Sequence, residues 1–383
     1  MGIDGLERRQ SRESGLLDTE GLVPIYLGED LVEPRNYDNW WHVEDDLNAL
    51  QDRLGEVTPH HRNVFATEMI LSLRVAVRLF AGSSPSFEVK VRDLVGGPTG
   101  AVDPEVIDGL RDTLDGLLRR RGIVRGDLPQ RIAEWEQSDF VPPAQLEGVF
   151  RTLMDQARDR TARMIFDCGT FDMALNPIRD APYSARCSFA ERKMDLNVDH
   201  DFTRAGMKHL VAHEVFPGHA TQLLYTQARL LEGRAYPEVL LCTANSVLGC
   251  VQEGIGDESV ELLDWIEDEN DMIQAELRRL RSAAQTSAAW YLMHDGWDAD
   301  AVADYLRQTA AGQEPWIEGR LRMAAHPFRG PFIASYWGGA VAVRAVRERT
   351  RPEHRREFIE YLYANTHSPS SLDLFQPSAT VSA

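Results

Sequence analysis

The chain has 383 residues, of which 43% are hydrophobic and 26% charged, as in an ordinary globular protein with a large core. Its 60 acidic side chains outnumber the 41 basic ones, and the net charge of −19 argues against nucleic acid or an anionic membrane as the main partner. No apolar run approaches the roughly 18 residues of a membrane span. The segment 1–16 lacks the apolar core of a secretory signal. We therefore expect a cytoplasmic protein, and a low cysteine usage of four also suits that reducing compartment.

Hydrophobic residues recur at three- and four-residue steps through most of the chain, which predicts a mainly α-helical fold. In the first half, Thr58-Pro59 and Asp103-Pro104 are each typical of an N-cap followed by a first-turn proline. The predicted helices there cover 43–54, 59–80, the residues after Pro104, and 143–166. The stripe Val43, Leu47, Leu50 and Leu54 and the stripe Val106, Ile107, Leu110, Leu114 and Leu117 should face the core.

The distribution of apolar residues predicts two helical lobes around an active-site cleft. Residues 36–160 should form the N-terminal helical lobe, and 161–383 the second lobe. Residues 1–35 and the last eight residues have few apolar anchors, so we expect them to be loosely ordered. Further helices are expected over 237–251, 258–294, 299–309, 331–349 and 352–364.

A short non-helical interval lies between residues 171 and 199. The segments Ala185 to Phe189 and Lys193 to Val198 predict a small β-hairpin, since Met194, Leu196 and Val198 alternate with polar residues. Its place directly before a helix of possible metal ligands suggests an edge strand along the cleft, where an extended peptide could bind by strand addition. Asn197 is a candidate contact to such a peptide. A purely structural hairpin fits the pattern equally well.

The most informative stretch is the heptapeptide that runs from His213 to His219, with Glu214 second and Pro217-Gly218 before the last residue. Imidazole is a favoured zinc ligand, and a glutamate beside a ligating histidine can act as general base. The two histidines are six residues apart, so an unbroken helix would direct their rings apart. Pro217 should open the helix, and Gly218 permits backbone angles that could return His219 toward His213. The alternative is a hydrogen-bonded cluster at a helix break, with no metal.

A catalytic zinc site needs a third protein ligand, often a carboxylate, and an open fourth position. Glu253 follows an apolar run and is our choice for this ligand. Asp257 lies four residues on, at the same face of a helix, and Asp257 and Glu258 are candidates to support the ligands. The alternative is a solvated acidic helix start.

Four more residues are candidates for the site. His209 shares a helix face with His213 and could hold a metal with it, but a supporting role suits it better because that pairing leaves the Pro-Gly break unused. His326 could orient a substrate oxyanion, and Arg329 could clamp a substrate carboxylate. Tyr336 could donate a hydrogen bond to an oxyanion. The alternative role for His326 and Arg329 is hydrogen bonding within their loop. The alternative for Tyr336 is packing in the core.

Two motifs resemble the bacterial domain-of-unknown-function family 885. One is H-E-x-x-P-G-H followed by Gln222, and the other is the E-G-x-x-x-E segment from Glu253 to Glu258. Later segments are also similar to that family, namely Pro331 to Gly339, with Ser335-Tyr336, and Ser368 to Leu374. The likeness spans roughly residues 165–375. It departs at Ile255-Gly256-Asp257, where the family has aromatic residues, and at Ala220, often a histidine there.

The family resembles mainly helical zinc metallopeptidases in fold and active-site layout. The resemblance implies that His213, His219 and Glu253 bind the metal, that Glu214 is the base, and that Tyr336 stabilises the transition state. The departures concern the substrate pocket more than the metal.

These observations lead to one main hypothesis, a zinc-dependent hydrolase of peptide or related amide bonds. Another divalent transition metal could replace Zn²⁺, and the partner would be a small molecule or a short peptide, with no nucleic acid and no membrane. One alternative is a metalloenzyme that acts on a non-peptide small molecule (an amide, ester or C–N bond) in secondary metabolism. The other is a non-catalytic helical binding protein that has lost the metal.

Overall fold

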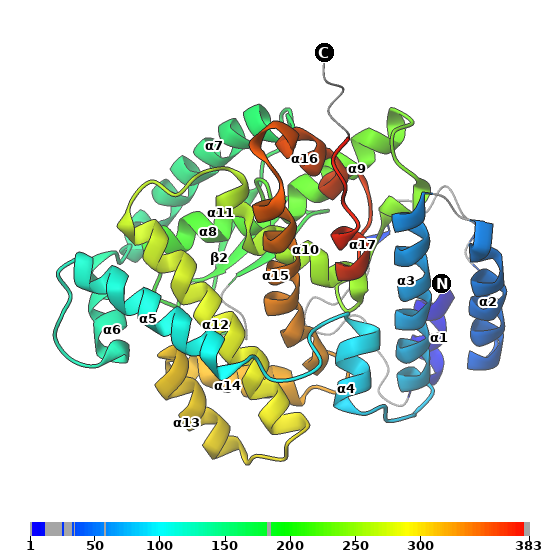
Figure 1. Ribbon diagram of the computed structural model, residues 1–383, viewed down its shortest axis with the longest axis horizontal. Helices are drawn as coiled ribbons and strands as arrows, with labels where there is room; N and C mark the ends of the chain where they lie inside the picture. Colours follow the sequence, from blue (N-terminus) through cyan, green and yellow to red (C-terminus); the bar gives the residue numbers. More distant parts are fainter. Residues whose placement is uncertain are drawn as a thin grey trace. The chain divides into compact units, whose positions relative to one another are not determined.

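The computed structural model describes residues 2–11, 25–26, 33, 35–56, 59–181 and 185–378, and it is mainly helical with a few short strands (Figure 1). This confirms the predicted fold class. The chain forms two compact units: Met1–Thr99, Gln222–Gly254 and Pro327–Ala383 make the first, and Gly100–Thr221 and Ile255–His326 make the second. Each unit therefore combines separate stretches of sequence, whereas the sequence predicted one stretch, 36–160, for the first lobe and 161–383 for the second.

The first unit is mostly helical and contains one two-stranded antiparallel ladder, β1 with β5. Its elements are α1 (Gly2–Gln10), β1 (Ile25–Tyr26), α2 (Trp40–Arg53), η3 (Leu54–Glu56), α3 (His60–Phe80), α4 (Phe87–Val89), the π-helical η4 (Lys90–Leu94), most of α9 (His219–Leu231), η6 (Pro237–Leu240), β5 (Leu241–Cys242), most of α10 (Val247–Asp257), η7 (Gly330–Phe332), α15 (Ile333–Arg349), η8 (Pro352–His354), α16 (Arg355–Ala364) and α17 (Pro369–Asp373).

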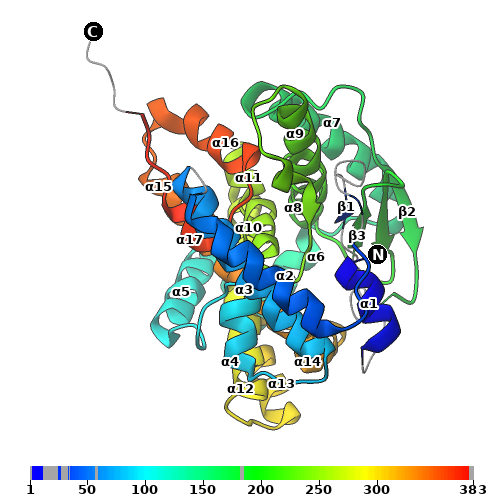
Figure 2. The ribbon, with the colours of Figure 1, turned by 90° about the vertical axis from the view of Figure 1, so that its right-hand side faces the viewer.

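Helix α3 is central to the first unit and packs against α2 on one side and α17 on another (Figures 1 and 2). One core cluster joins α1, α2 and α3 through the apolar residues Leu6, Val43, Leu47, Ile70 and Val77. Residues Gly2–Gln10, in the segment expected to be loosely ordered, thus form a helix with a buried leucine. Other parts of 1–35, and residues 379–383 at the other end, lie outside the described residues.

The start of α3 differs from the predicted cap. Pro59 itself occupies the N-cap position and provides no side-chain hydrogen bond, while Thr58 lies outside the described residues. In contrast, Asp103 caps α5 as predicted, since its carboxylate accepts the Glu105 N–H at 2.9 Å. Two residues expected in the core, Leu50 and Val106, are exposed instead because they lie at the edges of their apolar stripes.

The second unit carries the longest helix and a small sheet. Its elements are α5 (Pro104–Arg120), α6 (Leu128–Ser138), η5 (Pro143–Gln145), α7 (Leu146–Met164), β2 (Ala174–Ile178), β3 (Ala185–Ser188), β4 (Lys193–Asn197), α8 (Arg204–Glu214), the first turn of α9, the last turn of α10, α11 (Ser259–Leu262), α12 (Glu269–Met293), α13 (Ala299–Ala310) and α14 (Glu314–Ala325). Helix α12 packs against α5, α13 and α14. The helix expected over 258–294 is therefore two helices, and α14 was not predicted.

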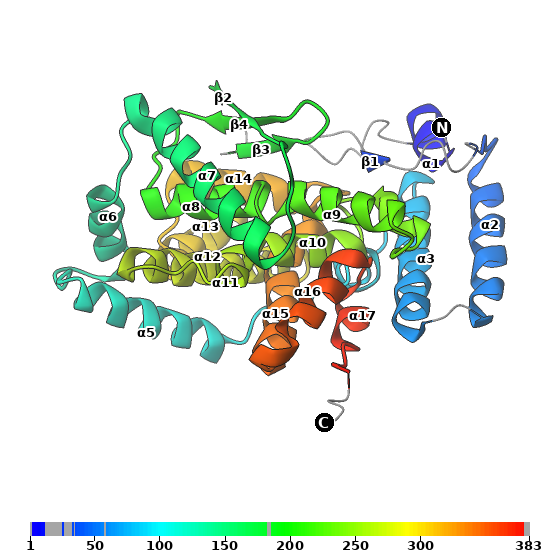
Figure 3. The same ribbon diagram turned by 90° about the horizontal axis from the view of Figure 1, so that it is seen from above.

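The predicted hairpin is confirmed as the antiparallel pair β3 and β4, and a third strand, β2, joins it in parallel. The order β2-β4-β3 makes β4 the central strand and leaves β2 and β3 at the edges. The sheet lies over α7 and α8 (Figure 3). Its edge strand β3 contacts α8, the helix that carries the first histidine of the motif.

Within the described part of the chain, no helix combines the length and the apolar character needed to cross a membrane.

Candidate metal site

The helix that carries the motif opens at the predicted place. Helix α8 begins after Thr203, whose hydroxyl accepts the Gly206 N–H at 2.9 Å, and it ends at Glu214. Pro217 follows a cis peptide bond and has no N–H for a helical hydrogen bond. A new helix, α9, begins at His219. The two histidines thus stand at the end of one helix and the start of the next.

Gly218 makes the tight turn between these helices possible, for a reason other than the one predicted. Its N–H donates to the Ala212 carbonyl at 2.8 Å, and a Cβ on Gly218 would lie 1.6 Å from the His213 carbonyl oxygen. Its φ is outside the left-handed region, so glycine is required here for close approach and not for an unusual backbone angle. The imidazoles of His213 and His219 lie with their centroids 4.8 Å apart and their planes at 89°.

A carboxylate orients the first imidazole. Asp257 Oδ1, at the last residue of α10, lies 3.2 Å from His213 Nδ1, which leaves Nε2 of that ring for a metal. Its other oxygen, Oδ2, pairs with Arg278 at 3.0 Å. Gly256 provides room for the ring, because a Cβ there would lie 2.8 Å from both Nδ1 and Cε1 of His213.

Glu253, the predicted third ligand, lies on α10 one turn before Asp257. Glu253 and Asp257 belong to one continuous helix, Val247–Asp257. The contacts of Asp257 therefore also hold the turn that carries Glu253. A nitrogen from each of His213 and His219 and a carboxylate oxygen of Glu253 lie within 4.8 Å of one another. Two imidazoles and a carboxylate are the donor set of many catalytic zinc sites.

His209, Asp257 and His213 also lie close enough to share an ion. The centroids of the His209 and His213 rings are 5.6 Å apart, and His209 Nε2 lies 3.9 Å from Asp257 Oδ1. Burial lowers the pKa of His209 well below its usual value, and Arg278 and His213 lower it further. The guanidinium of Arg278 on the same carboxylate disfavours a cation at this second group.

Glu258, expected to support the ligands, is fully buried and follows the last residue of α10. Its Oε1 lies 3.9 Å from Arg279 Nη2, within a group of acids around that arginine. Glu261 and Glu276 also pair with Arg279. Glu258 is not among the groups of described residues that could share an ion.

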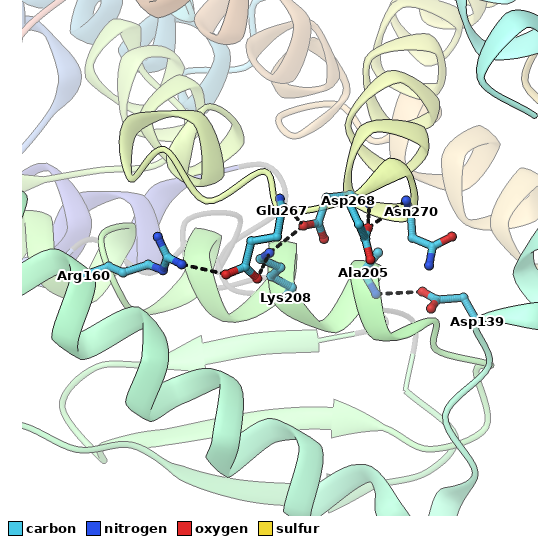
Figure 4. Close-up of polar contacts among 8 residues, drawn as sticks. Asp139, Arg160, Ala205, Lys208, Glu267, Asp268 and Asn270 are labelled. Atoms are coloured by element: carbon cyan, nitrogen blue, oxygen red, sulfur yellow. Dashed lines mark hydrogen bonds and ion pairs between the residues drawn. The ribbon is translucent and has the colours of Figure 1, made fainter. Parts of the chain in front are cut away.

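Ion pairs and a hydrogen bond connect α8 to neighbouring segments (Figure 4). Lys208, buried on α8, pairs with Glu267 at 3.0 Å and with Asp271 at 2.6 Å, and Arg160 of α7 pairs with the same Glu267 at 2.6 Å. At the start of α8, the Asp139 carboxylate accepts the Ala205 N–H at 2.9 Å. This network was not predicted, although a lysine within an apolar helix, next to His209, is a sequence signal for it.

The general-base candidate, Glu214, is partly exposed at the end of α8. Burial raises the pKa of the Cys187 thiol, and the nearby Glu214 carboxylate raises it further. Because Cys187 is on β3, the Glu214 side chain lies near the edge strand of the sheet.

Asn197 occupies the end of the central strand β4 and is almost fully buried. Its amide donates to the Ala181 carbonyl at 3.0 Å, and its oxygen accepts the Asp199 N–H at 3.1 Å. Both polar ends of the side chain are therefore used to close the loops at this end of the sheet. This arrangement favours a structural role over contact with a peptide.

Two donors hold the loop that leads to Arg329. Lys90 Nζ donates to the Pro327 carbonyl at 3.2 Å, and Asn245 Nδ2 donates to the Phe328 carbonyl at 2.6 Å. The Phe328 side chain is buried against Phe80, with their ring centroids 5.1 Å apart. Arg329 is half-buried at the start of η7. These contacts thus hold the loop backbone next to Arg329 in place.

His326 precedes this loop in the sequence, and Tyr336 follows it. His326 is the C-cap residue of α14, and its N–H donates to the Met323 carbonyl at 3.1 Å. Tyr336 lies on α15, half-buried, and its ring meets that of Phe332 edge-on at 5.5 Å.

The helices of Glu253 and Tyr336 touch through their backbones. A Cβ on Gly254 would lie 2.2 Å from the Gly339 carbonyl oxygen, and one on Gly339 would lie 1.8 Å from the Cys250 carbonyl oxygen. Each glycine is next to, or one turn from, a candidate site residue. No feature of the sequence indicated this contact between the two helices.

Comparison with protein-family models finds no match, and comparison with curated proteins finds none either. Two solved structures are similar in fold. One is "the putative lipoprotein from Colwellia psychrerythraea", with a TM-score of 0.59 and 14% identity over 85% of this chain and 65% of that chain. The other is "a putative lipoprotein of unknown function from Shewanella oneidensis", with a TM-score of 0.55 and 12% identity over 87% of this chain and 72% of that chain. The chain thus spans about two thirds of the first structure, and at these identities the likeness is one of fold alone.

Proposed function

We propose that this protein is a zinc-dependent hydrolase of peptide or related amide bonds. The observation that carries the proposal is the group formed by His213, His219 and Glu253, whose potential ligand atoms lie within 4.8 Å of one another. Three protein ligands with an open fourth position are the pattern of catalytic zinc sites, whereas structural sites use four protein ligands.

The residues around this group fit a metal. Asp257 lies on the Nδ1 side of His213, as the carboxylate partner of a ligating histidine does in zinc sites. Gly256 supplies the space that the imidazole ring occupies. A divalent ion in such a site lowers the pKa of a water molecule and polarises a carbonyl group.

Glu214 is the residue proposed to move the protons of the reaction. It immediately follows His213, is partly exposed and lies near β3. In the proposed reaction its carboxylate takes a proton from the attacking water and passes it to the leaving amine nitrogen. Tyr336 would donate a hydrogen bond to the oxyanion that develops on the substrate carbonyl.

The edge strand β3 supports a peptide as substrate. An edge strand presents unpaired N–H and C=O groups to which an extended peptide can bond. Such a peptide would pass close to Glu214. Arg329 and His326 remain candidates for binding the substrate, with a short peptide or a small amide as the proposed substrate and the cytoplasm as the proposed location.

Metal content and a single variant test the proposal. Purified protein should contain, or bind stoichiometrically, zinc or another divalent transition metal, and should cleave members of a panel of peptides and acyl amides. Glu214→Gln should retain the metal and lose about 100-fold or more of the turnover, since it removes the general base. Asp155→Asn, at an exposed site on α7, is the control and should keep both. Full turnover by Glu214→Gln would exclude Glu214 as the base, and a protein that takes up no metal would exclude the proposed chemistry.

A further inference from the structure

We infer that Arg278 is a positioning residue of the metal site, which holds Asp257 so that His213 presents Nε2 to the ion. The inference rests on the proposed function and extends it to a residue of a distant helix. Arg278 lies on α12, and its guanidinium meets Asp257 twice: Nη1 lies 3.0 Å from Oδ2, and Nη2 donates to the Asp257 main-chain carbonyl.

The main-chain contact has a clear physical reason. Asp257 is the last residue of α10, so its carbonyl has no hydrogen-bond partner within the helix. The negative end of the helix dipole also favours a cation at this position. Arg278 therefore caps α10 and pairs with the carboxylate of the same residue, a two-point contact that suits the planar guanidinium.

The contact fixes the carboxylate that faces His213. With Oδ2 paired to Arg278, Oδ1 is directed to His213 Nδ1 at 3.2 Å. A carboxylate at Nδ1 favours the tautomer with the proton on that nitrogen, and the lone pair of Nε2 is then available to a metal. The long helix α12 is packed against α5, α13 and α14, so it provides a rigid base for this chain of contacts.

The next residue on α12 offers a matched control. Arg279 has a similar side-chain exposure, 16% against 12% for Arg278, and it also forms ion pairs with acidic side chains. Its partners are Glu258, Glu261 and Glu276, and it makes no described contact with Asp257. Loss of either arginine should disturb the fold comparably, but only loss of Arg278 should disturb His213.

The experiment measures zinc affinity by competition between the metal-free protein and a fluorescent zinc chelator. The variants are Arg278→Met, Arg278→Lys, Asp257→Asn, the double variant Arg278→Met with Asp257→Asn, and Arg279→Met. Loss of a residue that supports a ligand weakens metal binding by about 10- to 100-fold. We expect that loss for Arg278→Met and for Asp257→Asn, a smaller one for Arg278→Lys, and no greater loss in the double variant than in Asp257→Asn. Arg279→Met should bind zinc as the unmodified protein does.

Nitrogen NMR of histidine-labelled, metal-free protein provides a readout that does not depend on zinc. The unmodified protein should show His213 with its proton on Nδ1, and Arg278→Met should lower the population of that tautomer. Unchanged zinc affinity in Arg278→Met, equal losses in the Arg278 and Arg279 variants, or additive losses in the double variant would each overturn the inference. If neither the unmodified protein nor any variant binds metal, the proposed function is wrong. The NMR measurement of the His213 tautomer then tests separately whether Arg278 positions His213. If the single Arg278→Met variant does not fold, the Lys variant decides between these outcomes.

Discussion

Replacement of Gly256 by alanine should damage the proposed metal site while leaving the fold intact. The added Cβ would lie 2.8 Å from Nδ1 and Cε1 of His213 and 3.0 Å from Cγ. Carbon atoms in contact prefer about 3.5 Å or more, so the imidazole must move by roughly 0.7 Å. Metal–ligand distances tolerate only about 0.2 Å. We therefore expect zinc affinity to fall about 10- to 100-fold and turnover by about 100-fold.

The control for this change is Gly116→Ala on α5, where an added Cβ would meet nothing within 4 Å. Alanine is a better helix former than glycine by up to about 1 kcal/mol, so Gly116→Ala should slightly stabilise the fold and keep full zinc affinity. The measurements are chelator competition for zinc and urea unfolding of the metal-free proteins. Equal zinc affinity in the two variants would refute the argument that Gly256 makes room for the ring.

Three further predictions concern stability. Burial lowers the pKa of His367 to about 4, and its Nε2–H donates to the Tyr361 carbonyl at 2.8 Å. As pH falls, the imidazole of residue 367 takes up a proton first in the unfolded chain, at its ordinary pKa of about 6.5. The stability that the neutral ring contributes is therefore complete above about pH 6.5 and is lost as pH falls toward about 4. His367 should contribute about 2 kcal/mol to the decrease in the free energy of unfolding between about pH 7 and pH 5, so the decrease measured by urea unfolding should be smaller by about that amount in His367→Gln, and an equal decrease in the two proteins would contradict this account. Asn245→Ala should lower the free energy of unfolding by about 1–3 kcal/mol, because the buried Phe328 carbonyl loses its 2.6 Å donor, and an unchanged urea midpoint would contradict it. Zinc at about 100 times its Kd should stabilise the protein and Glu214→Gln by about 2.7 kcal/mol, and a chelator should remove this gain in a thermal melt, whereas His213→Ala should show neither effect.

Local signals in the sequence predicted much of the secondary structure. Asp103-Pro104 starts α5 as expected, because a cap is a contact between near neighbours in the chain. Strand β2 escaped prediction because it contains Pro177, which is tolerated at its edge position in the sheet. Helix α14 escaped because its buried residues, among them Ile317 and Met323, are too widely spaced to give a clear helical period.

In the candidate site, too, the features set by near neighbours in the chain were predicted, and those set by distant residues were not. The opening of the helix at Pro217 followed from the missing N–H of one residue. The surroundings of His213 could not be predicted in full, because Gly256 meets its ring, and Arg278 meets Asp257, only through the tertiary fold. A glycine and an arginine in these segments carry no sequence signal for such a contact. The two units could not be predicted either, since each combines stretches far apart in the chain.

The backbone contact between α10 and α15 limits how the protein can change. Most helix pairs are separated by side chains, which can be exchanged for others of similar volume when a site adapts to a new substrate. Here Gly254 and Gly339 leave no such spacer, since any larger residue would meet a carbonyl group of the opposite helix. Under the proposed function, new specificity should therefore arise from loops and from the side chains around Tyr336, while the spacing of these two helices stays constant.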